Sequence, residues 1–196
     1  APQGARIDLL RSRRNHPRHQ AAVAGPLLSM VDRKALDLGD PPIIKVDSVE
    51  AGQALVKGEV ERKPDFIKVW FIHQPGDDLA KQEAIVKAAG DAAHAAGIRL
   101  AVHAAELVVA KAALRAGADY LVHSVFDEPV DDEFIALALK NHAIYCPTLF
   151  VGEGYWLTFT NTWKPTPVEA ARGDPTVMDT LDDLSTIPPE KIPERV

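Results

Sequence analysis

The sequence has a single cysteine, Cys146, and no long apolar run in its 196 residues. One cysteine excludes an internal disulfide and any zinc site built from several thiolates. No stretch approaches the roughly 20 apolar residues that span a bilayer, and no charged-then-apolar signal pattern opens the chain. We therefore expect no membrane partner, and the sequence is compatible with the cytoplasm or with export after signal cleavage.

The sequence also has no excess of basic residues. The 28 acidic residues outnumber the 22 basic residues, which gives a formal net charge of −6. Proteins that neutralise nucleic-acid phosphates are usually basic, so we expect no nucleic-acid partner and a small-molecule substrate instead. Residues 1–19 are locally Arg-rich and lack periodicity, which predicts an irregular segment that is either solvated or a basic arm.

Short apolar segments alternate with amphipathic segments between residues 20 and 154. Buried strands separated by helices indicate an α/β fold with a parallel sheet, in a barrel or a doubly wound arrangement. Strands are predicted at residues 20–25, 66–71, 98–103, 120–123 and 143–146. Helices are predicted at about 48–61, 79–96, 106–116 and 131–141, and a loop is expected through Asp40-Pro41-Pro42.

This alternation stops after Gly154. Residues 155–196 begin with the aromatic residues Tyr155, Trp156, Phe159 and Trp163 and then contain six prolines. Aromatic residues on a long loop commonly cover ligands. We interpret residues 155–196 as a lid over the mouth of the fold or as an irregular tail.

Two segments repeat one pattern, in which a glycine is followed by an apolar strand that ends in a histidine. They are Gly97-Ile-Arg-Leu-Ala-Val-His103 and Gly117-Ala-Asp-Tyr-Leu-Val-His123. In a barrel the carboxyl ends of the strands form the active-site face, so His103 and His123 are expected to converge there. Lys68 lies in the preceding strand.

Lys68 is costly to bury as a bare cation, so it must be paired, neutralised or modified. Two imidazoles with one oxygen ligand form a normal shell for zinc or a similar divalent ion. Such an ion lowers the pKa of a bound water and supplies hydroxide near neutral pH. We therefore predict a shared metal site at Lys68, His103 and His123. Taken singly, each residue also has a structural interpretation, as a hydrogen-bonded histidine or a salt-bridged lysine.

Four segments resemble the amidohydrolase superfamily, in its imidazolonepropionase-like and Xaa-Pro dipeptidase-like branch. They are Phe66-Ile-Lys68-Val-Trp, Ala101-Val-His103-Ala, Lys111-Ala-Ala-Leu-Arg-Ala-Gly-Ala-Asp119 and Leu121-Val-His123-Ser. The resemblance covers about Gly25 to Leu149. It implies a (β/α)₈ barrel with one or two divalent metal ions, usually zinc. It also implies that Lys68 is carboxylated and bridges two metals, and that His103 and His123 are the ligands of the fifth and sixth strands.

The sequence departs from the family pattern at both ends. The His-x-His of the first strand is missing, because His16 and His19 flank Pro17 with a different spacing. The aspartate of the eighth strand is missing too, because the late aspartates lie in the Pro-rich tail. The predicted strands correspond to about five units of a barrel, the third to the seventh. Uncovered sheet edges associate readily, so we expect a homo-oligomer or a complementing chain.

The leading hypothesis is hydrolysis of a C–N bond, in an amide, cyclic amide or dipeptide, by a metal-activated water. Trp70, His73, Thr148 and Tyr155 follow or end strands or open the tail and are candidate substrate-binding residues. The general acid or base is unassigned. Two alternatives stay open: a Schiff-base lyase or aldolase that uses Lys68 as nucleophile, and a non-catalytic subunit or inactive fragment.

Overall fold

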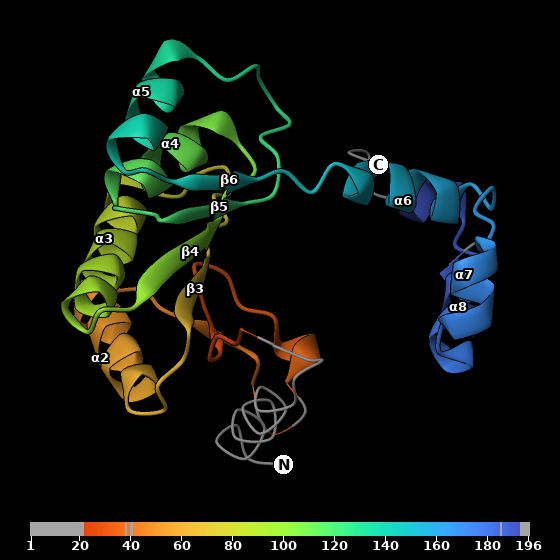
Figure 1. Cartoon of the computed structure of the whole chain (residues 1–196), viewed down its shortest axis with the longest axis horizontal. Helices are drawn as coiled ribbons and strands as arrows, with labels where there is room; N and C mark the ends of the chain where they lie inside the picture. The colour runs from red at the N-terminus through yellow and green to blue at the C-terminus, as the bar shows by residue number, and fades with distance from the viewer. Residues whose placement is uncertain (1–21, 38, 40, 185, 193–196) are drawn as a thin grey trace. The chain divides into compact units, whose positions relative to one another are not determined.

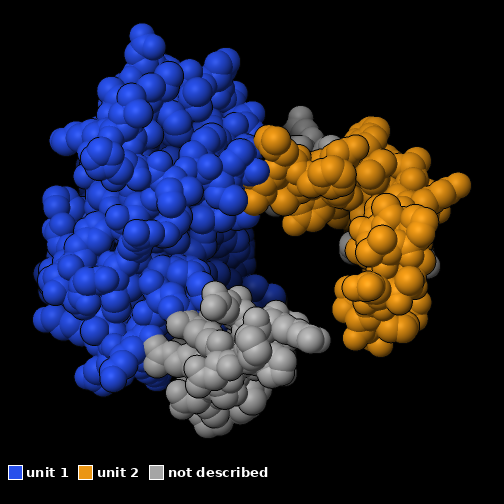
Figure 2. Space-filling view, viewed as in Figure 1, with its two compact units in different colours: residues 1–147 blue, residues 148–196 orange. Residues whose placement is uncertain are grey.

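The computed structural model describes residues 22–37, 39, 41–184 and 186–192. The chain forms two compact units, Ala1–Pro147 and Thr148–Val196, which Figure 2 shows in blue and orange. The Arg-rich segment predicted at residues 1–19 lies outside the described residues, and so do the first two residues of the strand predicted at 20–25.

The first unit contains one sheet of six parallel strands in the order β2-β1-β3-β4-β5-β6. From β3 onward, neighbours in the sheet are also neighbours in the sequence. The strands are β1 (Leu27–Ser29), β2 (Ile43–Lys45), β3 (Phe66–Trp70), β4 (Arg99–His103), β5 (Tyr120–Val122) and β6 (Ile144–Cys146).

The α-helices of this unit lie side by side along one face of the sheet, as Figure 1 shows. They are α2 (Val49–Val60), α3 (Leu79–Ala95), α4 (Leu107–Arg115) and α5 (Asp132–Lys140), and a short 3₁₀ helix, η1 (Lys34–Leu36), follows β1. A doubly wound sheet carries helices on both faces, whereas a barrel carries them outside only. The predicted α/β fold is confirmed as a portion of a TIM-type barrel. No helix in the described part of the chain is long and apolar enough to cross a membrane.

Local sequence signals account for where these helices begin and end. Ser48, Asp78 and Asp131 each accept a hydrogen bond from the backbone N–H three residues later, over 3.1, 3.1 and 2.9 Å. These caps satisfy N–H groups that have no partner within the helix. Gly97 and Gly117 follow α3 and α4 with φ of 72° and 93°, a conformation that favours glycine. Each helix therefore lies within about two residues of its predicted bounds.

Alternate residues of β3 face opposite sides of the sheet. Ile67 and Val69 are 1% and 0% exposed and belong to the core beneath the helices. Lys68 and Trp70, which have the opposite parity, are only partly buried and face the side without helices. The sheet thus has an apolar face closed by helices and a second face that carries the chemically active side chains.

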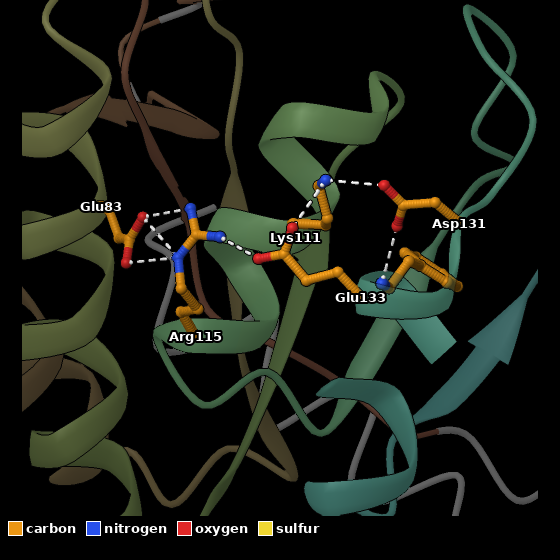
Figure 3. A network of polar contacts seen from close by, with 6 residues as sticks. Glu83, Lys111, Arg115, Asp131 and Glu133 are labelled. Carbon is orange, nitrogen blue, oxygen red and sulfur yellow. Dashed lines mark hydrogen bonds and ion pairs between the residues drawn. The ribbon is translucent and has the colours of Figure 1, made fainter. Parts of the chain in front are cut away.

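An ion-pair network joins the outer surfaces of α3, α4 and α5 (Figure 3). Arg115 on α4 lies 2.8 Å from Glu83 on α3 and 3.3 Å from Glu133 on α5. Lys111 on α4 lies 2.8 Å from Glu133 and 2.9 Å from Asp131, which is also the N-cap of α5. Exposed pairs contribute little individually, but shared partners fix the spacing of three successive helices.

Three strands differ from the expectation. β1 begins after Pro26 rather than at residue 20, and β2 was not predicted, because its three residues carry too short a pattern. β6 lies at the predicted position but is exposed instead of buried, with Ile144 at 51% exposure. It is an edge strand, so only β5 pairs with it among the described strands.

The second unit consists of helices without a strand among its described residues. They are α6 (Phe150–Phe159), α7 (Pro167–Arg172), α8 (Pro175–Leu184) and the 3₁₀ helix η2 (Pro189–Lys191). Thr166 and Glu169 form a reciprocal capping box at the start of α7. These helices were not expected, and the boundary predicted after Gly154 falls within α6, whereas the two units divide after Pro147. The function of residues 155–196 as a lid stays a prediction.

Two glycines test the packing of the helices on the sheet. Alanine favours a helix interior over glycine by up to about 1 kcal/mol. At Gly58 on α2 nothing lies within 4 Å of an added Cβ, whereas at Gly90 on α3 it would meet Leu100 Cδ2 at 2.9 Å and Ala116 O at 3.1 Å. We expect Gly58→Ala to raise the free energy of unfolding and Gly90→Ala to lower it, as measured by urea denaturation. A stabilising Gly90→Ala would contradict this packing.

Candidate active site

The register of the parallel strands brings Lys68, Trp70 and His103 to one face of the sheet. Trp70 on β3 pairs with His103 on β4, and Lys68 pairs with Ala101 two residues earlier. Residues in register on parallel strands point to the same side, so these side chains share the face without helices. Trp70 and His103 are the last residues of their strands. The predicted position at the carboxyl ends of the strands is therefore observed for both.

His123 reaches this site through an unusual backbone conformation. It directly follows β5, has φ of 88°, and donates a backbone hydrogen bond to Cys146 O at 3.0 Å. A non-glycine residue with positive φ is uncommon, and such strain persists only where the surroundings enforce it. The ring centroid of His123 lies 4.6 Å from that of His103, with the planes at 66°. The two histidines predicted to converge do so.

Lys68 places a buried amine beside these rings. Its Nζ is buried and has no hydrogen-bond partner among the described residues. Burial lowers the pKa of Lys68 to about 8, because desolvation disfavours the charged form. The pKa of His123 is also lowered, first by its own desolvation and then by the positive charge of Lys68. The Lys68 amine and the His123 imidazole therefore interact electrostatically.

Further side chains surround this centre. The Trp70 ring meets the His103 ring edge-on at 5.9 Å, and the Arg33 guanidinium lies 5.3 Å from the centroid of the Trp70 ring. The hydroxyl of Ser124, next to His123, is buried without a hydrogen-bond partner among the described residues. Arg33 and Ser124 were not predicted. The position of Ser124 directly after His123 was a signal by which the sequence could have indicated it. Arg33 gave no such signal, because only the pairing of β1 with β3 brings it to Trp70.

Each of the other candidate substrate residues has contacts or a place of its own in the fold. His73 Nδ1 lies 2.8 Å from Gln82 Oε1 on α3, which anchors the ring to the helix. Tyr155 stacks on Phe159 within α6, with centroids 6.2 Å apart. Thr148 opens the second unit, as Tyr155 continues it. Their roles in substrate binding stay predictions, and so does that of Trp70 despite its contact with His103.

The residues present fit a divalent metal ion in part. Among the described residues, no three His, Cys, Asp or Glu side chains are grouped to hold an ion. His103 and His123 nevertheless offer two nitrogens from rings 4.6 Å apart. Zinc–nitrogen bonds are about 2.0–2.1 Å long, so one ion can reach both rings. The buried amine of Lys68 is the adjacent group that can supply an oxygen ligand, after modification.

Comparisons with known proteins support the fold. No family model and no curated protein matches the sequence. A solved Xaa-Pro dipeptidase with methionine in its active site is 22% identical, with a TM-score of 0.61 over 94% of this chain and 50% of that one. A prolidase in complex with N-methylphosphonate-L-proline is 20% identical, with a TM-score of 0.54 over 83% of this chain and 42% of that one.

A third match is the ochratoxinase of A. niger, which is 19% identical with a TM-score of 0.51. The aligned region covers 81% of this chain and 34% of the ochratoxinase chain. The chain thus spans half the length of these structures or less. At such identities the similarity establishes a shared fold, that of part of a barrel, and it is consistent with helices on one face only.

The lowered pKa of Lys68 predicts a specific dependence of stability on pH. Between pH 8 and the unfolded value of 10.5, the unfolded chain holds a proton that the folded chain has lost. The free energy of unfolding should therefore rise with pH in this window, by up to about 1.4 kcal/mol per unit from this group. Urea denaturation in a chelator should show this slope, and Lys68→Met should remove it. Equal slopes in the two proteins would contradict a desolvated amine.

Proposed function

We propose that this chain carries the metal-binding part of an amidohydrolase-type site that hydrolyses a C–N bond in a small molecule. The observation that carries the proposal is the convergence of Lys68, from the middle of β3, with His103 and His123, which end or follow the next two strands. The candidate substrates are amides, cyclic amides and dipeptides. The Xaa-Pro dipeptidase and the prolidase among the structural matches support a dipeptide.

A divalent ion, zinc in this proposal, would be held by His103, His123 and a carboxylated Lys68. When bound, the ion would polarise the substrate carbonyl and lower the pKa of a water molecule. A pKa of about 8 leaves part of Lys68 as a free amine near neutral pH. That amine can add to carbon dioxide, forming an N–C bond and releasing a proton. The resulting carbamate replaces a buried cation with an anionic oxygen ligand, which removes the burial penalty of an unpaired ammonium.

The residues around the centre would bind and orient the substrate. Trp70 forms an apolar wall beside His103, and its ring carries the Arg33 guanidinium on its face. His73, Thr148 and Tyr155 remain candidates for the remainder of the pocket. No described residue is assigned as general acid or base. The sequence likewise shows no counterpart of the eighth-strand aspartate of the amidohydrolase pattern.

The open parts of the sheet support a further element of the proposal, a complementing portion of the barrel. The β6 edge is exposed, with Ile144 at 51%, and α5 next to it exposes Leu139 at 70% and Ile135 at 47%. Parallel strands are normally buried on both faces, so an open edge flanked by apolar side chains favours association. We propose that strands supplied from outside these residues cover this edge and provide the missing ligands.

Metal uptake tests the site directly. The chain should bind Zn²⁺ in equilibrium dialysis with bicarbonate present, as measured by elemental analysis. Changes to groups that only orient a metal ligand weaken affinity about 10–100-fold, so His103→Ala and His123→Ala should each weaken it at least tenfold. His142→Asn, at an exposed residue that also has positive φ, is the matched control. Wild-type affinity in both alanine variants would refute the shared site.

A second candidate function is a Schiff-base lyase or aldolase, because the same lowered pKa makes the Lys68 amine nucleophilic. Isotopic labelling separates the two chemistries. ¹³C-bicarbonate should give a carbamate carbon resonance in the wild type that Lys68→Arg lacks. Borohydride reduction in the presence of a small aldehyde would instead trap a stable adduct on Lys68, detected by peptide mass spectrometry. Trapping without a carbamate signal would favour the lyase.

A further inference from the structure

Arg33 follows β1, and its backbone is held at the carboxyl end of the sheet. Ser29, the last residue of β1, pairs with Trp70 and is fully buried. The Ser29 hydroxyl donates to Val31 O at 2.8 Å and accepts from Val31 N at 3.0 Å, which fixes how the chain leaves the strand. Arg33 then becomes the N-cap of η1, where its carbonyl accepts from Leu36 N at 2.9 Å and its side chain takes no part in the cap. The main chain therefore sets the position of Arg33 beside the candidate site.

The Arg33 guanidinium lies over the Trp70 ring and still has hydrogen-bond donors to offer. It is 5.3 Å from the ring centroid, and the same ring contacts His103, which in turn contacts His123. The Arg33 side chain is exposed, and no described residue forms a hydrogen bond or ion pair with its guanidinium. A guanidinium over a ring keeps N–H groups at its rim, in the planar fork that fits a carboxylate. The ring contact thus orients this fork without using its donors.

The described surroundings supply no anion to this guanidinium. Asp32 pairs with Lys34 Nζ at 3.8 Å, and the Asp37 carboxylate accepts the Gly39 N–H at 2.9 Å. In the described part of the chain, no acid joins the two histidines of the centre in a cluster. Lys68 adds a further basic group to the same centre. Basic side chains without a counter-charge favour an anionic ligand.

We propose that Arg33 selects substrates that carry a carboxylate, which pairs with its guanidinium while the rest of the molecule lies against Trp70. This inference rests on the proposed function, because it names the substrate class of the same site. It favours dipeptides, which have a free carboxylate next to the amide bond, over neutral amides and neutral cyclic amides. A charge-assisted, bidentate hydrogen bond is stronger than a neutral one. Arg33 binds and orients the substrate in this proposal and moves no proton.

An acid and its amide, titrated separately, test this pairing without any hydrolysis. The probes are N-acetylglycine, which is an anion at pH 7, and neutral N-acetylglycinamide, each added to the ¹⁵N-labelled full chain in a chelator. The three tryptophans give three indole N–H signals, and Trp70→Phe identifies the signal of Trp70. The acid should shift this signal with a dissociation constant at least about fivefold below that of the amide, because only the acid forms an ion pair.

Two variants and a matched control complete the titrations. Arg33→Gln removes the cation and should bring the affinities for acid and amide within about twofold of each other. Arg33→Lys keeps the charge without the planar fork and should retain only part of the preference. Lys34→Gln removes the same charge from the next residue, whose side chain is 90% exposed, and should change the preference less than about twofold. No preference for the acid in the wild type, or the full preference in Arg33→Gln, would overturn the proposal.

Zn²⁺ uptake by the same preparations separates this inference from the proposed function. Arg33 is no metal ligand in the proposal, so Arg33→Gln should keep the wild-type affinity for Zn²⁺ in equilibrium dialysis. Normal uptake without a preference for the acid overturns the selection of a carboxylate alone. Failed uptake by the wild type overturns the metal site, whereas the titrations need no metal and still decide the role of Arg33.

Discussion

The register between β3 and β4 is the constraint on which the candidate site depends. The two strands pair from Phe66 with Arg99 to Trp70 with His103, which puts Lys68, Trp70 and His103 on one face. The alternate residues Ile67, Val69, Leu100 and Val102 lie beneath the helices. A slip of one residue would turn His103 toward the helices and bring an apolar side chain to the open face. The burial of the core and the geometry of the site are therefore fixed by the same hydrogen-bond ladder.

Desolvation also acts on two buried side chains, Lys68 on β3 and Glu59 on α2, and shifts their pKa values in opposite directions. It lowers the pKa of Lys68 and raises that of Glu59, and both values come to about 8. Near physiological pH such a value leaves Glu59 mostly protonated and neutral, and it leaves a fraction of Lys68 as the free amine. Buried ionisable groups of this kind gather at functional sites, although structural ion pairs also perturb pKa values. Neither Lys68 Nζ nor the Glu59 carboxylate has such a pair among the described residues.

The outer and inner faces of the first unit differ in how closely they are packed and covered. Outside, capped helices pack closely enough that Gly90 has no room for a side chain, and Arg115 and Lys111 link three helices. Inside and at the β6 edge, the sheet is open and Ile144 is half exposed. This contrast is expected for a portion of a barrel, in which the helices cover the outer face of the sheet and an edge strand is left open.

The sequence by itself determined the elements with strong periodicity and the residues that end them. It predicted α2 to α5 and the strands β3 to β6, because alternation and capping are local signals. It also placed Lys68 within a strand and His103 and His123 at the ends of the next two. It could not reveal β2, the positive φ of His123 or the stacking of Arg33 on Trp70. These depend on pairing between distant segments, which only the tertiary structure decides. The unpartnered carboxyl group of Glu59 belongs to the same class, because an acid on an amphipathic helix looks solvated until the neighbouring strand covers it.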